Sequence, residues 1–190
     1  MNLPWLMKLG PLIGILIDSH LNLKSQVNYI STKIKRNIGI LPKIRHHVTN
    51  LYFLIYPFLI YGITAWGNTY KSNVAPIITL QKRVLQIITF SYYYDHSNFL
   101  FKALEIIKFE DIIFLHNAIY MHDFYSGTLP PAFSNYFTPV NKWHKYNTKL
   151  ASRSSYTLPL VMTNYGKFSI KLKGAKIWNS LSEEIKSHQR

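Results

Sequence analysis

The stretch from Val48 to Tyr70 most constrains the fold of this chain, because it contains no Asp, Glu, Lys or Arg. Its centre, LYFLIYPFLIYGITAW at residues 51–66, is so apolar that it must be buried in a protein core or in a membrane. A membrane-spanning helix needs about 20 apolar residues, whereas this run is shorter and contains Pro57 and Gly62. The sequence therefore favours a buried core helix that is kinked at Pro57. The alternative is a small basic protein that residues 51–66 anchor to a membrane.

Helical periodicity dominates the chain up to about residue 128. The first predicted helix has an apolar face made of Val27, Ile30, Ile34, Ile38 and Leu41, and Pro42 is expected to break or bend it. A second helix is expected to begin near Pro76, with a stripe made of Ile77, Leu80, Val84, Ile87 and Ile88. Two more helices are predicted over residues 98–106 and 109–127, the latter with Gly127 as its C-cap.

Short β elements are expected at both ends of the chain. LIGILID at residues 12–18 is typical of a buried strand. YTLPLV at residues 156–161 and GKFSIKLKG at residues 166–174 are strand-like and are joined by the turn residues TNYG. In the second, Lys171 and Lys173 alternate with apolar residues, so they would share a basic face. With a helix over residues 175–186, the predicted fold class is mainly α (α+β): a helical bundle, a short N-terminal strand, and a small C-terminal β-hairpin plus helix.

Charge is the strongest compositional signal. The chain has 22 Lys and Arg against 8 Asp and Glu, a formal net charge of +14. Such an excess favours a polyanionic partner such as nucleic acid, or an anionic membrane surface. The chain has no cysteine, which excludes disulfides, Cys-containing zinc sites and a thiol nucleophile.

The sequence contains no recognisable catalytic constellation. Asp18 stands alone at the end of a predicted strand, and Glu110 and Asp111 are neighbours that point to different sides of a helix. His116 and His122 are six residues apart, which is not the i, i+4 spacing of a helical metal site. Phosphate-binding glycine loops and nucleophile elbows are missing from the sequence. We therefore expect no catalysis by this chain alone, and no metal or cofactor bound to it.

Basic residues fall into four groups along the chain. They are Lys33, Lys35, Arg36, Lys43 and Arg45; Lys71, Lys82 and Arg83; Lys142, Lys145, Lys149 and Arg153; and Lys167, Lys171, Lys173 and Lys176. Any one group would usually be a solvated surface, but four groups with few acids between them favour at least one surface that contacts phosphates. The candidate contacts to a nucleic-acid backbone are Lys33, Lys35, Arg36, Lys43, Arg45, Lys82, Arg83, Lys171 and Lys173. Nothing in the sequence indicates base-specific recognition.

Four stretches, in this order, resemble one protein family. They are LIGILIDSHLNLKSQVNYISTKIKRNIGIL, LYFLIYPFLIYGITAWGNTYKSNVAPIITLQKRVLQIITF, FEDIIFLHNAIYMHDFYSGTLPPAF and TNYGKFSIKLKGAKIWNSL. Together they are similar to the part that follows the catalytic palm in LINE-type, jockey-like non-LTR retrotransposon reverse transcriptases. The similarity covers about residues 12–185. Met162 and Ser182 depart from it, since the family commonly has arginine and proline there.

The resemblance implies four segments. They are a remnant of the last palm strand at residues 1–20, a helical thumb-like region at residues 21–128, a basic connection at residues 129–155, and a β-hairpin with a C-terminal helix at residues 156–190. The family's polymerase makes DNA on RNA with palm aspartates that hold Mg²⁺, including an aromatic-x-Asp-Asp turn that this chain lacks. The resemblance therefore implies a catalytically incomplete C-terminal fragment of an RNA-directed DNA polymerase, with Mg²⁺ expected only in the palm.

The partners that follow from this resemblance are RNA or an RNA–DNA duplex, bound without sequence preference, and possibly a palm region. On this interpretation we expect no stable membrane insertion and an intracellular location, in the cytoplasm or nucleus. A transposon remnant without a function is a further alternative that the sequence leaves open.

Overall fold

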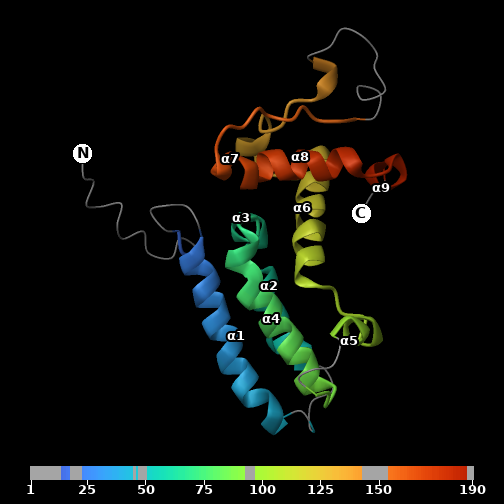
Figure 1. Ribbon diagram of the computed structural model, residues 1–190. Coiled ribbons are helices and arrows are strands. Elements are labelled where there is room, and N and C mark those ends of the chain that lie inside the picture. The colour runs from blue at the N-terminus through green and yellow to red at the C-terminus, as the bar shows by residue number, and fades with distance from the viewer. Residues whose placement is uncertain are drawn as a thin grey trace, which may run out of the picture. The chain divides into compact units, whose positions relative to one another are not determined.

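The computed structural model describes residues 14–17, 23–44, 46, 51–92, 97–142 and 154–187, and within these ranges the chain is mainly helical (Figure 1). The chain divides into two compact units, residues 1–112 (unit 1) and residues 113–190 (unit 2), and the boundary falls inside helix α6, Phe109–Tyr125. The other elements of unit 1 are α1 (Lys24–Ile44), η2 (Leu51–Leu54), α2 (Tyr56–Ile60), α3 (Ile63–Trp66), α4 (Lys71–Ile88) and α5 (Ser97–Ala103). Those of unit 2 are η3 (Pro131–Phe133), η4 (Val140–Lys142), α7 (Asn164–Phe168), α8 (Ile170–Ser180) and α9 (Glu183–Ser187).

Two long helices, α1 and α4, lie side by side in unit 1 and run in the same direction (Figure 1). Their C-terminal ends meet, since the rings of His46 and Phe90 are 5.2 Å apart between centroids. The predicted apolar stripes form the interior, and their buried members are Val27, Ile30, Ile34, Leu41, Ile77, Val84 and Ile87. Ile38, Leu80 and Ile88 are half-buried, and Leu85, which lies outside the predicted stripe, is fully buried. The spacing of apolar residues therefore predicted correctly which faces of both helices are buried.

The helix start predicted at Pro76 is wrong, and so is the break predicted at Pro42, whereas the alternative of a bend at Pro42 stays a prediction. Pro42 neither breaks α1 nor ends it, because it lies in the last turn, where α1 continues to Ile44. Pro76 lies inside α4, which begins five residues earlier at Lys71. The extra turn buries Val74, so packing extends the helix beyond the start that proline chemistry suggested.

The apolar run at residues 51–66 is not one kinked helix but three short ones, η2, α2 and α3. Pro57 lies in the first turn of α2, and the chain breaks instead at Gly62, whose φ of 61° is left-handed. Trp66 is fully buried and its Nε1 donates to the carbonyl oxygen of Tyr61 at 2.8 Å, across that break. Within the described residues, no helix combines the length and apolar character needed to cross a membrane.

One buried side chain, Gln81 of α4, connects three segments of unit 1. Its Nε2 donates to the hydroxyl oxygen of Tyr52 at 2.7 Å and to the carbonyl oxygen of Ile107 at 2.9 Å. Its Oε1 accepts from the backbone N–H of Phe109 at 2.9 Å. We call this set of contacts the Gln81 clamp. It thereby satisfies one of the backbone N–H groups that the first turn of α6 would otherwise leave without a partner.

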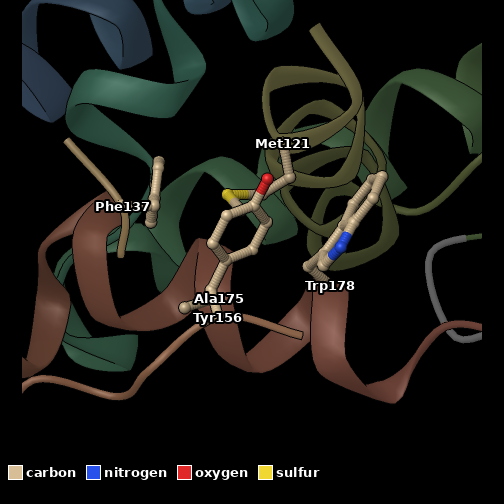
Figure 2. Close-up of a cluster of buried hydrophobic side chains, with 5 residues drawn as sticks. All are labelled: Met121, Phe137, Tyr156, Ala175 and Trp178. Atoms are coloured by element: carbon tan, nitrogen blue, oxygen red, sulfur yellow. The ribbon is translucent and has the colours of Figure 1, made fainter. Parts of the chain in front are cut away.

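Unit 2 is organised around an aromatic cluster between α6 and α8 (Figure 2). The buried members are Met121, Phe137, Tyr156, Ala175 and Trp178. Gly174 lets α8 approach closely, since a Cβ atom there would lie 2.8 Å from the sulfur of Met121. Side chains of α8 also fix the extended segment that follows Ser154. Asn179 makes two hydrogen bonds to the backbone of Tyr156, at 2.8 and 2.9 Å, and Trp178 Nε1 donates to the Ser154 carbonyl at 3.0 Å.

The predicted C-terminal β-hairpin is wrong. Residues 166–174 form the end of α7 and the first half of α8, and Tyr156 makes only an isolated antiparallel bridge to Pro139. Thr163 caps α7 by accepting from the backbone N–H of Gly166 at 3.2 Å. The buried positions Leu172, Ala175 and Trp178 then recur every three residues, so a helical period prevails over the short alternation of apolar and basic residues.

Two further boundaries differ from the prediction. The last predicted helix, residues 175–186, begins earlier at Ile170 and is divided into α8 and α9. Of the predicted strand at residues 12–18 the structure describes only residues 14–17. There a turn at Gly14 precedes a single bridge residue, Ile15, and these four residues contain no strand.

Candidate nucleic-acid interface

The exposed faces of α1 and α4 carry most of the predicted phosphate contacts. Neither helix contains an Asp or a Glu. Their buried stripes point into unit 1, which leaves the remaining surface to polar and basic side chains. The exposed predicted contacts on these two helices are Lys35, Arg36, Lys43, Lys82 and Arg83. Unit 1 therefore brings two of the four basic groups of the sequence onto adjacent helices.

Lys33 and Arg45 differ from the other predicted contacts of the first group. Lys33 is half-buried, and its Nζ lies 5.4 Å from the centroid of the Tyr29 ring, one helical turn earlier. This cation–π contact holds the Lys33 side chain along the helix surface. Arg45 lies outside the described residues, and its role stays a prediction.

Lys82 and Arg83 occupy different parts of the exposed face of α4, because neighbouring residues are about 100° apart around a helix. Lys82 lines a small hollow of about 130 Å³ together with Lys108 and Glu110. The Glu110 carboxylate lowers the positive potential on that side of the helix. Like α4, helix α1 contains no carboxylate, and Lys35 and Arg36 are both exposed on it.

Lys171 and Lys173 belong to α8 of unit 2, and the structure does not place them on one basic face. They are two positions apart on a helix, about 200° around its axis. Lys171 is exposed and its Nζ lies 5.4 Å from the centroid of the Tyr136 ring. Lys173 is half-buried with its Nζ 5.1 Å from the Phe168 ring, and burial lowers the pKa of its ammonium group. The shared face predicted from strand alternation is therefore wrong.

Both units are strongly positive. Residues 1–112 have twelve Lys and Arg against five Asp and Glu, and residues 113–190 have ten against three, so each unit carries a net charge of +7. Glu183, one of the three acids of unit 2, pairs with the buried Lys186 at 3.0 Å, which leaves the net charge of the unit unchanged. Each unit alone therefore has the charge balance of a nucleic-acid-binding domain.

Groups with catalytic or metal-binding chemistry are sparse. In the part of the chain that the structure describes, His, Asp and Glu side chains form no group of three that could hold a metal ion. Burial lowers the pKa of His116 below its ordinary value, because a less solvated imidazole favours its neutral form.

Two features of these surfaces were missed in the sequence. One is the aromatic partner of each half-buried or stacked lysine. The pair Tyr29 and Lys33 has i, i+4 spacing and could have been found, whereas Tyr136 and Lys171 are too far apart in sequence. The other is a hollow next to the aromatic cluster of unit 2, in the aromatic and polar stretch PPAFSNYFTP at residues 130–139.

Comparison with protein-family models, with curated proteins and with solved structures found no match for this chain.

Proposed function

We propose that this protein binds the sugar–phosphate backbone of nucleic acid without reading its sequence, through the exposed cations of α1 and α4. The observation that carries the proposal is the pairing of two packed helices that contain no Asp or Glu and expose five of the predicted contacts. Lys and Arg on such a surface displace condensed counterions from the backbone, which drives sequence-independent binding.

The dimensions of α1 are consistent with this proposal. Its 21 residues correspond to a length of about 30 Å. A duplex presents one negative charge per about 1.7 Å of its axis. The exposed cations Lys35, Arg36 and Lys43 lie in the C-terminal half of α1, within about 12 Å along its axis, so they can meet a few neighbouring phosphates at once.

The resemblance to non-LTR reverse transcriptases supports a more specific proposal. On this proposal the chain corresponds to the thumb and C-terminal extension of such an enzyme and holds RNA or an RNA–DNA duplex. The catalytic carboxylates and their Mg²⁺ would belong to a palm region, which is then also a candidate partner. The protein would act inside the cell, in the cytoplasm or nucleus. Purified chain should not extend a primer with Mg²⁺, and sustained extension after purification would contradict this proposal.

Salt dependence tests the backbone contacts. Binding of the full chain to a labelled RNA–DNA duplex, followed by fluorescence anisotropy, should weaken about a hundredfold between about 50 mM and about 200 mM salt if about four phosphates are neutralised. The double variant K35Q/R36Q should bind about tenfold more weakly and reduce the slope of log K against log salt by about two.

The matched control is K167Q/K176Q, which removes the same charge from exposed positions of unit 2. It should change duplex affinity much less than K35Q/R36Q. Salt-independent affinity, or equal losses in the two double variants, would exclude α1 as the contact surface.

A further inference from the structure

A hollow of about 540 Å³ opens in unit 2 beside the aromatic cluster. Aromatic rings form much of its wall, and they belong to Phe124, Tyr125, Phe133, Phe137 and Tyr156. Its polar lining comes from Ser134, Asn135, Thr138 and Lys142. Ligand pockets in proteins are typically about 300–1,000 Å³ and combine apolar walls with a few polar groups. The hollow has both the size and the mixed lining of such a site.

The aromatic wall is held in place by the core of unit 2. Phe124 contacts Phe137 edge to face, with centroids 4.8 Å apart, and Tyr156 at 5.5 Å. Phe137 and Tyr156 are almost fully buried. Tyr125 is different, because it packs against Trp178 at 5.2 Å but leaves 47% of its surface exposed. The site is therefore rigid at its base and presents an accessible aromatic side chain at its edge.

The polar side of the hollow is available to a ligand. Ser134, Asn135 and Lys142 are exposed, and their side chains make no hydrogen bond to the described part of the chain. Asn135 supplies both a donor and an acceptor, Ser134 a hydroxyl, and Lys142 a positive charge. None of the lining residues is acidic. A purely apolar ligand would leave these polar groups without partners, and a metal ion would find no carboxylate to bind.

We propose that this hollow binds one unpaired nucleotide of a single-stranded nucleic acid. The base would lie against the aromatic wall and Tyr125, with its polar edge toward Asn135 and Ser134, and a flanking phosphate would pair with Lys142. Base–aromatic contact tolerates any sequence, because every base has a π face. This site is separate from the backbone contacts on α1 and α4, and it adds recognition of a base to the binding of phosphates.

The test compares two strands of equal charge. Affinity of the full chain for a labelled oligouridine is measured against an abasic strand of the same length, so that both carry the same phosphates. The intact strand should bind about tenfold more tightly, the value expected for one stacked base. Tyr125→Ala should abolish this preference and Asn135→Ala should reduce it, whereas Tyr125→Phe should keep it.

A second pair of variants tests the phosphate contact. Lys142→Gln should lower the affinity for both strands. The control is Lys176→Gln, which removes an exposed charge that does not line the hollow, and it should lower both affinities less. Equal affinity of the unmodified chain for intact and abasic strands would overturn the proposal even if duplex binding remains salt-dependent. A base preference that survives in K35Q/R36Q without any loss of duplex affinity would instead overturn the proposed function and leave this site in place.

Discussion

Units 1 and 2 carry the same net charge of +7 and are built in different ways. Unit 1 buries aliphatic stripes between two long helices, α1 and α4. Unit 2 buries the rings of Phe137, Tyr156 and Trp178 around Met121 of α6, and partly buried aromatic rings of the same helix pack against them. The difference shows that net charge does not determine architecture, as expected for a property of the whole surface. Architecture instead determines where the exposed charge lies. Among the described residues, it lies on the exposed faces of α1 and α4 in unit 1 and mainly on α7 and α8 in unit 2, with Lys142 the one charged residue that lines the hollow.

The strongest test of this comparison removes one buried indole from each unit. Trp178→Ala should lower the free energy of unfolding of unit 2 by about 3–5 kcal/mol, because it leaves a large cavity in the aromatic cluster. It also leaves the carbonyl oxygen of Ser154 without its donor. Urea unfolding followed by circular dichroism measures the loss, and hydrogen exchange with peptide resolution locates it.

Trp66→Ala is the matched control, since Trp66 is equally buried in unit 1. Peptides of unit 1 should lose protection in that variant, and peptides of unit 2 in Trp178→Ala. Loss of protection throughout the chain in both variants would show that the two units unfold as one.

The Gln81 clamp provides the next largest effect and is specific to unit 1. Gln81→Met keeps the approximate size of the side chain but leaves the N–H of Phe109, the carbonyl of Ile107 and the hydroxyl of Tyr52 without this partner. We expect unit 1 to lose about 2–3 kcal/mol of stability. Thr79→Ala, an exposed change on the same helix, should stay within about 0.5 kcal/mol in the same urea titration. Equal losses would mean that the clamp contributes nothing beyond the helix itself.

Two glycines, Gly174 in α8 and Gly39 in α1, test how closely the helices of the two units are packed against their neighbours. An alanine Cβ at Gly174 would lie 2.8 Å from Sδ and 3.2 Å from Cγ of Met121. Gly174→Ala should therefore destabilise unit 2 by about 1–2 kcal/mol, after allowance for the better helix propensity of alanine. Gly39→Ala in α1 meets no atom within 4 Å, and it should stabilise unit 1 by about 0.5–1 kcal/mol. Melting temperatures should shift in opposite directions; a rise in both would show that Met121 moves aside freely.

The smallest effect is common to both units and appears at alkaline pH. Burial, the largest cause, raises the pKa of Tyr52 in unit 1 and of Tyr156 in unit 2 from 10.0 to about 12. Because the unfolded chain ionises these phenols first, the stability they contribute is complete below about pH 10 and is lost as pH rises toward about 12. Allowing for partial solvent access, each tyrosine should account for about 1 kcal/mol.

Urea titrations at about pH 9 and about pH 11 measure this loss. Tyr156→Phe should flatten the pH dependence of unit 2 and leave that of unit 1 unchanged. A stability that does not change between these two pH values would contradict the assigned burial of both phenols.

Sequence reasoning succeeded where local spacing decides the structure. The stripes of α1 and α4 follow from residues that repeat every three or four positions. The end of α6 follows from Gly127, which has a φ of 71° and whose N–H donates to the carbonyl of Phe124 at 3.2 Å. The next N–H, that of Thr128, donates to Asp123 at 3.0 Å, which completes a Schellman motif. These features depend on a few neighbouring residues and on nothing distant.

Sequence reasoning failed where distant contacts decide. Alternation over residues 168–172 fits a short strand, and only the packing of Ala175 and Trp178 against Met121 selects the helix. The break at Gly62 is joined by the bond from Trp66 to Tyr61, which the pattern of apolar letters does not reveal. The same distinction separates the site residues whose placement was predicted correctly from those whose placement was not. Exposed cations on α1 and α4 follow from helical spacing, whereas Lys171 and Lys173 were assigned to a strand that does not form.

Because of the Gln81 clamp, hydrogen exchange at the backbone amide of Phe109 reports local unfolding of unit 1. This N–H is buried and donates to a side chain of another helix, so it exchanges with solvent only when α4 and the start of α6 separate. The protection of this one amide against exchange therefore measures the free energy of that separation in a chain with no label attached. Exchange of the same amide would show whether a bound duplex makes this local opening of unit 1 rarer.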